Sequence, residues 1–409
     1  MDIRAPKGTD DILPPQSRIW SHAMAVFEDM SRRYGYGMVF TPMFERTELF
    51  ERGVGADTDV VEKQMYTFAD RKGRSLTLRP EATASVVRAV LESGRAGVFK
   101  GAYSGPMFRY ERPQRGRRRQ FWQLGVEYLG EPSPLADVEV IEVGYRFLEK
   151  MAVPDVEVQL NSVGDPGDRV EYRTELQSWL REREEQLSPE SRRRIDTNPL
   201  RVLDLKADRD TTAHAPTPVD HLGTAAAEHF AAVKLGLENV GIPYVIAPRL
   251  VRGLDYYNRT VFEYVPRQYG AAQSAVGGGG RYDGLAETLG GKPMYGVGLA
   301  MGLDRILLAG GDIDLGPELD AYVVVADRTL QARAVSLVGE LRLDGLSIDM
   351  DLGDSSVTAQ FRAADRRNAD VAIVVGPEWA DGEVVIRDLT SGVQDNIRVE
   401  EIAPWLHKR

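Results

Sequence analysis

An arginine-rich turn between two strand-like segments places the tightest constraint on how this chain of 409 residues can fold. Residues 109–119 carry a net charge of +5, from Glu111 and six arginines: Arg109, Arg112, Arg115, Arg117, Arg118 and Arg119. Pro113 and Gly116 favour a turn, and the flanking segments GPMFRYE and QFWQLGVEYLG have the aromatic and apolar content of strands. The sequence therefore predicts a β-hairpin within an antiparallel sheet, with the charge at its tip.

The charge of this turn alone leaves two interpretations open. A run of charged residues is often only a solvated loop. Arginine, however, bonds two phosphate oxygens at once through its planar guanidinium. Arg109, on a rigid strand, would then bind a small buried phosphate, whereas the arginines at the tip would reach a triphosphate or the backbone of a nucleic acid.

Composition divides the chain into three regions. Residues 1–165 begin with an amphipathic helix over 17–33 and continue with helices and short strands (76–78, 121–128 and 156–160) without a βαβ rhythm, which predicts an α+β domain with an antiparallel or mixed sheet. The same character returns over 241–315, whereas residues 166–240 are charge-dense and predict a helical insertion. Residues 318–409 alternate strands and helices, which predicts an α/β domain with a largely parallel sheet and a helix capped by Asp354 or Ser355.

Two glycine-rich segments resemble nucleotide-binding loops but fit neither known pattern. The spacing of Gly296, Gly298 and Gly302 is one residue longer than the dinucleotide fingerprint. The run 277–280 has no Lys-Ser/Thr after it, so it is not a P-loop. It is expected to be either a mobile loop or a place where the backbone closely approaches a ligand.

The composition excludes several classes of site and partner. The absence of cysteine rules out disulfides, thiolate metal sites and a cysteine nucleophile, and the five histidines are scattered without metal-ligand spacing. A net charge of −11 argues against a protein that coats DNA. No stretch approaches the roughly 20 apolar residues of a membrane span. We therefore expect a cytoplasmic protein without membrane or DNA partners.

Further polar residues stand in apolar surroundings. Each could be a buried ion pair or a core tyrosine, but several that converge would form a site, since buried charges need partners. Converging carboxylates would bind an ammonium or an imidazole, and converging arginines a phosphate. The residues are Glu81 at a strand end, Gln123 and Glu127 on one face of a strand, and Arg252, Asp255, Tyr256 and Tyr257 in one apolar segment.

Together these motifs resemble the class II aminoacyl-tRNA synthetases and, among them, the histidyl-tRNA synthetase family. The second and third class motifs correspond to FRYERPQRGRRRQFWQLGVE and GVGLAMGLDRILL, and Pro42 in VFTPMFE corresponds to the proline of the first. Segments typical of the histidine enzymes are RLVRGLDYYNRTVFE, GGGRYDGL, KGTDDILPP and LRPEATA. Two positions depart from the pattern, because Asp304 stands where a glutamate is usual and Ala82 where a glycine is common.

The resemblance implies a histidine–tRNA ligase. Residues 1–165 and 241–315 would form the class II catalytic domain, 166–240 a helical insertion, and 318–409 the anticodon-binding domain. The enzyme would activate L-histidine with ATP and Mg²⁺ to histidyl-adenylate, transfer it to the 3′ end of tRNA(His), and act as a homodimer. The 321–409 segment has 10 basic and 15 acidic residues, so we expect weak anticodon contacts.

The resemblance also implies a role for individual residues, and it assigns no protein side chain to a metal. Arg109 and Arg252 would flank the α-phosphate as catalytic residues. ATP would contact Arg109, Glu111, Arg117 and Arg305. Histidine would contact Glu81, Thr83, Gln123, Glu127, Tyr256 and Tyr257. The acceptor end of tRNA would meet Gln114 and Arg119.

Two alternatives share this fold. One is a non-catalytic paralogue that acts as the regulatory subunit of ATP phosphoribosyltransferase, and the other is a tRNA-sensing domain of a stress kinase. Such regulatory subunits usually lack the C-terminal domain and lose arginines and ring-reading residues. This chain keeps Arg109, Arg252, Arg305, Glu127 and Tyr257, and it has no kinase segment.

Overall fold

The computed structural model describes residues 3–55, 58–114, 116–267 and 275–409. Contacts divide the chain into two units, Met1–Ile313 and Asp314–Arg409. Arg115 of the arginine-rich turn lies outside the described residues. Within the described parts, no helix is both long and apolar enough to cross a bilayer.

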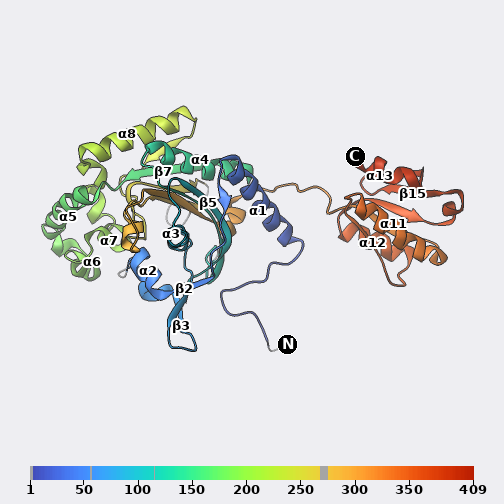
Figure 1. Cartoon of the computed structure of the whole chain (residues 1–409), viewed down its shortest axis with the longest axis horizontal. Coiled ribbons are helices and arrows are strands. Elements are labelled where there is room, and N and C mark those ends of the chain that lie inside the picture. Colours follow the sequence, from blue (N-terminus) through green and yellow to red (C-terminus); the bar gives the residue numbers. More distant parts are fainter. Residues whose placement is uncertain (1–2, 56–57, 115, 268–274) are drawn as a thin grey trace. The chain divides into compact units, whose positions relative to one another are not determined.

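An eight-stranded sheet forms the centre of the first unit (Figure 1). Its order is β1 (Gly37–Met38), β5 (Phe99–Phe108), β6 (Gln120–Leu129), β11 (Gly296–Gly302), β10 (Gly277–Arg281), β9 (Asn258–Pro266), β7 (Val156–Ser162) and β8 (Tyr244–Ile246). The five central pairings are antiparallel, and only the outermost pairings, β1–β5 and β7–β8, are parallel among the described strands. The predicted antiparallel sheet is therefore confirmed, with the arginine hairpin as β5 and β6.

Three helices cover one face of this sheet: α1 (Gln16–Arg33), α4 (Pro134–Lys150) and α8 (Thr224–Asn239). Side chains alternate along each strand, so Leu124, Val126, Phe262 and Tyr264 join the helices in one buried core. Each such side chain contributes roughly 1.5–3 kcal/mol when fully buried. The intervening residues of β6 and β9, among them Gln123, face the opposite side.

The opposite face is only partly covered. Helix α3 (Thr83–Glu92) and the short α9 (Leu285–Thr288) pack there against Leu129, Val261 and Tyr282, and Figure 1 shows α3 inside the curve of the sheet. A small antiparallel sheet lies beside α2 (Thr47–Val54), in the order β2 (Phe44–Arg46), β4 (Ser75–Leu78) and β3 (Tyr66–Ala69). A π-helical turn, Val60–Gln64, precedes β3, and α10 (Leu303–Ala309) follows β11. The uncovered part of this face remains open to ligands.

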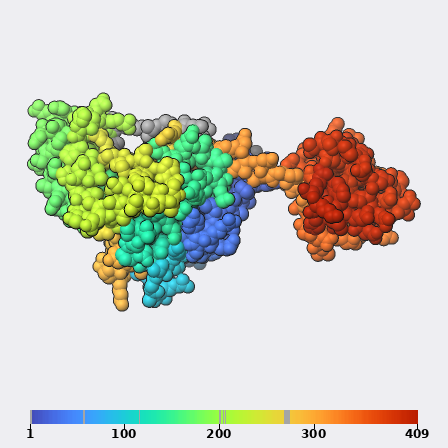
Figure 2. Space-filling model, turned by 90° about the horizontal axis from the view of Figure 1, so that it is seen from above, coloured from blue at the N-terminus to red at the C-terminus, as the bar shows by residue number. Residues whose placement is uncertain are grey.

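Residues 166–240 are helical, as their charge-dense pattern predicts. They contain α5 (Pro166–Arg181), α6 (Pro189–Arg194), α7 (Pro199–Asp204) and four 3₁₀ turns (Glu184–Gln186, Lys206–Asp208, Thr211–His214 and Pro218–His221), and they end in α8. Tyr172, Leu176 and Leu180 of α5 form a core of their own with Ile195 and Val202. In Figure 2 these helices, green to yellow, form one end of the unit.

A buried ionic network joins this helical region to the large sheet. Arg281 of β10 is fully buried and donates to Asp137 of α4, with an Nε–Oδ2 distance of 3.1 Å. His229 of α8 contacts the same carboxylate at 3.3 Å and Arg259 at 3.4 Å, and Arg259 pairs with Asp165 at the start of α5 at 2.7 Å. Five elements, α4, α5, α8, β9 and β10, therefore depend on one another for charge balance.

The glycine run 277–280 is a strand, so the prediction of a mobile loop was wrong. As part of β10 it pairs with β9 and β11 on both sides and is buried. Side chains would collide with both neighbouring strands, since a Cβ on Gly279 would lie 2.8 Å from the Cα of Leu299 and one on Gly278 3.1 Å from the Cα of Glu263. The glycines thus permit close packing of three strands.

The second unit is an α/β domain. Its sheet has the order β13 (Ile348–Met350), β12 (Leu319–Val325), β14 (Ala369–Val375), β15 (Glu383–Asp388) and β16 (Gln394–Arg398). Its helices are α11 (Gln331–Leu343), α12 (Val357–Arg366) and α13 (Ile402–His407), with 3₁₀ turns at Arg328–Leu330, Pro377–Asp381 and Val399–Glu401. Two of the four pairings are antiparallel, so the sheet is less parallel than predicted. The cap of α12 is Ser356, whose hydroxyl accepts from the Ala359 amide at 3.3 Å, and not Asp354 or Ser355.

Candidate active site

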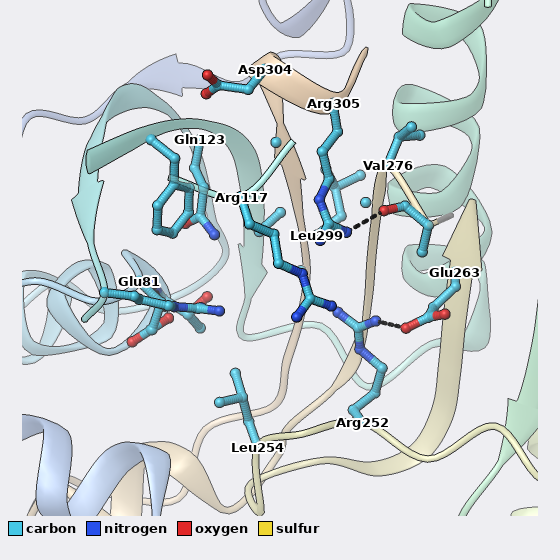
Figure 3. Close-up of a pocket in the computed structure, with 18 of the residues that line it drawn as sticks. Glu81, Arg117, Gln123, Arg252, Leu254, Glu263, Val276, Leu299, Asp304 and Arg305 are labelled. Carbon is cyan, nitrogen blue, oxygen red and sulfur yellow. Dashed lines mark hydrogen bonds and ion pairs between the residues drawn. The ribbon is translucent and has the colours of Figure 1, made fainter. Parts of the chain in front are cut away.

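A cavity opens on the uncovered face of the large sheet, and most of the predicted site residues line it (Figure 3). Its floor is made by β6, β9, β10 and β11, and its sides by the arginine hairpin, the start of α3 and the segment before β9. In Figure 3, Glu81 and Gln123 lie on one side and Glu263 and Arg305 on the other. We call the part of the cavity around Arg117, Arg252 and Arg305 the arginine side and the part around Glu81 and Gln123 the opposite side.

Five arginines line the described part of this cavity: Arg109, Arg117, Arg118, Arg252 and Arg305. Arg118 pairs with Asp10 at 3.1 Å and with Asp304 at 3.3 Å, Arg252 pairs with Glu263, and Arg117 lies 3.7 Å from Glu111. Arg118 and Arg252 are thus paired with carboxylates, whereas the contact of Arg117 is long. Arg109 and Arg305 donate to neutral carbonyls, so the arginines leave positive charge available for a ligand.

Arg109 and Arg305 are held by main-chain carbonyls. Arg109 Nε donates to Pro80 O at 2.9 Å, and Arg305 donates to Gly116 O at 3.2 Å and to Ala275 O at 2.7 Å. Burial lowers the pKa of both guanidinium groups, and the neighbouring Arg117 lowers that of Arg305 further. A buried cation whose hydrogen bonds to the described residues go to neutral carbonyls is stabilised by a bound anion. Phosphate suits this arrangement because each guanidinium can bond two of its oxygens.

Two carboxylates lie near the start of α3, Glu81 in the cavity wall and Glu127 behind it. Glu81 precedes α3 and accepts from the amides of Thr83 at 2.7 Å and Ala84 at 3.0 Å, which fixes it at the helix N-terminus. Glu127 of β6 is fully buried and accepts from the Thr83 hydroxyl at 2.6 Å and from the Tyr282 hydroxyl. Burial raises the pKa of both carboxyls, that of Glu127 to about 8.

An amide and two phenol groups also line the cavity. Gln123 is buried, and its Oε1 has no hydrogen-bond partner among the described residues, so a ligand donor would satisfy it. The rings of Tyr256 and Tyr257 lie 4.5 Å apart, and both side chains line the cavity. Acceptors and phenols placed in this way can bind a ligand that carries an ammonium group and ring N–H groups.

Glycines in the floor make room for these side chains. A Cβ on Gly278 would lie 2.9 Å from Arg252 Nη1, and one on Gly280 would lie 2.8 Å from the Tyr257 ring. Gly298 similarly faces Glu127. The glycine run therefore serves the site indirectly, because it lets Arg252 and Tyr257 lie directly on the sheet.

The structure brings most of the predicted residues together, and three lie elsewhere. Glu127 sits behind Thr83 and Tyr282 and not in the cavity wall. Gln114 is exposed at the hairpin turn, where its main chain pairs with that of Arg117. Arg119 lies outside the wall and donates to Glu111 O at 3.3 Å and to Lys7 O at 3.4 Å. Its guanidinium also covers the Tyr110 ring at 3.9 Å.

Sequence reasoning missed three residues of the wall. Glu263 pairs with Arg252, Tyr282 donates to Glu127, and Arg118 links Asp10 to Asp304. Tyr282 directly follows the glycine strand, and Glu263 lies in the same motif as Tyr257, so both stood within recognised segments. Arg118 could not be separated from its arginine neighbours, because only the hairpin register decides which of them faces the cavity.

Metal ligands are sparse here. Within the described ranges, no group of three or more His, Cys, Asp or Glu side chains is placed to hold a metal ion. A metal at this site would therefore depend on oxygens supplied by a ligand.

The high pKa of Glu127 predicts a pH-dependent stability. Below about pH 4.5, the carboxyl is protonated in both the folded and the unfolded chain. As the pH rises toward 8, the unfolded chain releases this proton and the folded chain keeps it, so the free energy of unfolding falls. The Glu127→Gln variant has no carboxyl group to titrate at this position. Its free energy of unfolding should therefore rise, relative to that of the wild type, by on the order of 2 kcal/mol between pH 5 and pH 8. Urea unfolding at both pH values measures the difference, and a constant difference would contradict the prediction.

Comparisons with known proteins agree with this geometry. A family model described as "Histidyl-tRNA synthetase" matches residues 8–165 and 171–306, and one described as "Anticodon binding domain" matches residues 320–409. A protein of Desulforudis audaxviator named "Histidine--tRNA ligase" is 45% identical over 421 residues, which cover 100% of this chain and 99% of that protein. The structure of apo S. aureus histidyl-tRNA synthetase is 34% identical with a TM-score of 0.82 and covers 99% of both chains. A Bacillus halodurans structure titled "ATP phosphoribosyltransferase regulatory subunit/histidyl-tRNA synthetase" is 23% identical, covers 92% of this chain and 99% of that chain, and has a TM-score of 0.66, which shows a shared fold alone.

Proposed function

The chain belongs to the histidyl-tRNA synthetase family, and on that premise we propose that it joins L-histidine to tRNA(His) in two steps that use ATP. The observation that carries this proposal is one cavity that brings arginines together with carboxylate, amide and phenol groups. The first step forms histidyl-adenylate, and the second transfers the histidyl group to the 3′ end of the tRNA.

ATP occupies the arginine side in this proposal. Arg109 and Arg252 flank the α-phosphate as catalytic residues, Arg117 and Arg305 bind the outer phosphates, and Glu111 lies near the adenine. Mg²⁺ would be held mainly by the outer phosphates, as is usual for this ion, which fits the finding that no group of three or more acidic or histidine side chains in the described ranges is placed to hold a metal. It would neutralise charge on the pyrophosphate.

Histidine occupies the opposite side. Its ammonium group meets Glu81, Thr83 and Gln123, while Glu127 and Tyr257 read the ring nitrogens with Tyr256 alongside. The unpaired Gln123 Oε1 supports this assignment, because it stays without a hydrogen bond when a ligand lacks an N–H donor. A site with such buried polar groups rejects analogues strongly.

The chemistry needs orientation and positive charge more than proton transfer. A carboxylate oxygen of histidine attacks the α-phosphorus, the new oxygen–phosphorus bond forms, and pyrophosphate leaves. The attacking group is already an anion, so no general base is required. Arginines on both sides of the phosphate stabilise the negative charge that gathers there and hold the reactants in line. In the second step, a terminal ribose hydroxyl attacks the carbonyl and AMP leaves.

The tRNA contacts are further parts of the proposal. The acceptor end would meet the arginine hairpin of the catalytic domain (1–165 and 241–315) near Gln114 and Arg119. Residues 166–240 would form the helical insertion. Residues 318–409 would bind the anticodon, with weak contacts because of their net negative charge. We place this reaction in the cytoplasm.

The regulatory-subunit alternative has less support. The relatives named histidine–tRNA ligase match the full length at 42–45% identity, and the cavity keeps its arginines and its histidine-side residues together. The likeness to the Bacillus halodurans structure concerns the fold alone.

Exchange of labelled pyrophosphate into ATP tests the first step, and charging of tRNA(His) tests the second. The protein is assayed with each of the twenty amino acids separately. Exchange with histidine alone is the expected result. No exchange from folded protein, combined with binding to ATP phosphoribosyltransferase, would replace this proposal with the regulatory alternative.

We also propose a homodimer, formed around the small sheet and the segment that contains Pro42. Phe40, Met43, Phe44 and Phe68 are exposed there, and the rings of Phe44 and Phe68 lie 6.4 Å apart. An exposed apolar cluster of this kind usually marks an interface. Light scattering should give twice the chain mass for the wild type and one chain mass for a Phe44→Asp/Phe68→Asp variant. Leu343→Asp, at an exposed site of the second unit, is the control, and an unchanged mass in the double variant would contradict the interface.

A further inference from the structure

The position of Arg252 depends on side-chain contacts and not on a rigid element. Residues 247–257, all of them described, form neither helix nor strand, so the backbone alone does not fix the direction of this side chain. Arg252 Nη1 donates to a carboxylate oxygen of Glu263 (Figure 3). The guanidinium also lies 6.0 Å from the centre of the Tyr257 ring. The carboxylate is the strongest of these contacts, because both partners are charged.

Glu263 is well placed to act as the fixed partner. It lies in the middle of β9, where it is paired with Gln159 of β7 on one side and Gly278 of β10 on the other. The missing side chain of Gly278 leaves the space that Arg252 fills, since a Cβ there would lie 2.9 Å from Nη1. β9 therefore holds the Glu263 carboxylate in a fixed place, and Gly278 of β10 leaves space beside it for the Arg252 guanidinium.

The remaining face of the guanidinium is available to a ligand. Arg252 Nε is buried and has no hydrogen-bond partner among the described residues. The side chain lines the cavity together with Arg109, Arg117 and Arg305, whose like charges would repel a free guanidinium. An unpaired buried donor in a cluster of cations suits an anionic oxygen.

We propose that Glu263 is a positioning residue for Arg252: by binding Nη1 it directs the other guanidinium nitrogens toward the α-phosphate. This inference rests on the proposed function. Glu263 acts through Arg252 alone and does not touch the substrate. The consequence is that loss of Glu263 lowers the rate of the chemical step and leaves the binding of ATP and histidine nearly intact.

The test compares Glu263→Gln with the wild type in histidine-dependent pyrophosphate exchange. Loss of orientation should lower kcat by ~10²-fold and leave both KM values within ~3-fold. Glu263→Asp keeps the charge on a shorter side chain and should lose ~10-fold in kcat. Glu157→Gln is the matched control, because Glu157 lies on the paired strand β7, binds the exposed Arg267 at 3.0 Å, and should leave kcat unchanged.

A double-variant comparison separates positioning from a general structural effect. In an Arg252→Ala background, measured by single turnover, Glu263→Gln should add less than ~3-fold to the loss, since its partner is already gone. An equal loss in both backgrounds or an unchanged kcat in Glu263→Gln would overturn the inference. A wild type without histidine-dependent exchange would instead overturn the proposed function.

Discussion

Replacing Arg252 with alanine is expected to lower the rate of histidine-dependent pyrophosphate exchange by about 10³-fold. The substitution removes one of the two arginines that we place beside the α-phosphate, and negative charge concentrates there when the histidine carboxylate attacks. The donor is pre-positioned and partly shielded from water, so its loss is costly. Glu263 is also left without its cation, which places an uncompensated negative charge beside the phosphate.

The expected loss should appear in kcat, because the interaction is strongest in the transition state. Arg267→Ala is the control: Arg267 is an exposed arginine near the end of β9 that pairs with Glu157, and its loss should leave exchange unchanged. The fold of both variants is compared by circular dichroism. If Arg252→Ala keeps exchange within ~3-fold of the wild type, Arg252 is not a catalytic residue and the proposed geometry of the ATP side fails.

Local patterning predicted much of the fold. The helix over 17–33 is α1 within one residue, and the hairpin is β5 and β6. Both depend on signals contained in a short window: an apolar stripe with a helical period, and two strand-like runs around a turn. The mixed character of the second unit's sheet was not predicted, because β15 and β16 form an antiparallel extension and nothing local specifies the direction in which two strands pair.

The glycine run shows the limit of local reasoning. Glycine is unfavourable in a strand and typical of loops, so residues 277–280 favoured a loop. The structure overrides this preference through long-range contacts, as β9 and β11 pack against both sides and Arg252 and Tyr257 lie across the surface. The alternative prediction, a close approach of the glycine backbone to another group, was nearer to the structure. Here, however, the groups that approach the backbone are side chains of the protein and not a ligand.

The candidate site was predicted largely through resemblance. Charge density alone left a solvated loop and a phosphate site open for residues 109–119, and only the fold shows that Arg109 and Arg117 face a cavity while Arg119 covers Tyr110. Glu263 was missed because a single glutamate in a strand has no distinguishing pattern. Its partner Arg252 lies eleven residues away, and their contact depends on how the intervening segment turns back over β10.

Replacing Arg281 with alanine should destabilise the first unit by about 3–5 kcal/mol. The reason is that Asp137 stays fully buried while losing its main cation. Burial alone would raise the pKa of Asp137, but His229 and Arg281 hold that pKa below its usual value. The carboxylate is therefore charged in the folded protein. The carbonyls of Glu131 and Ser133 also lose a donor. Thermal unfolding measures the effect as a lower Tm.

Arg181→Ala is the comparison, since the Arg181–Asp196 pair is exposed and screened by solvent, so its loss should change the stability little. An Arg281→Met/Asp137→Leu variant should recover part of the stability of Arg281→Ala, because it removes the buried charge together with its partner. Equal Tm values for Arg281→Ala and Arg181→Ala would contradict the network.

Because His229 and Arg259 connect the same carboxylate to α8 and to Asp165 at the start of α5, the loss of stability in Arg281→Ala should reach the helical region as well as the sheet. Faster amide hydrogen exchange in α5 and α8 of this variant, with unchanged exchange in α11 of the other unit, is therefore the expected pattern.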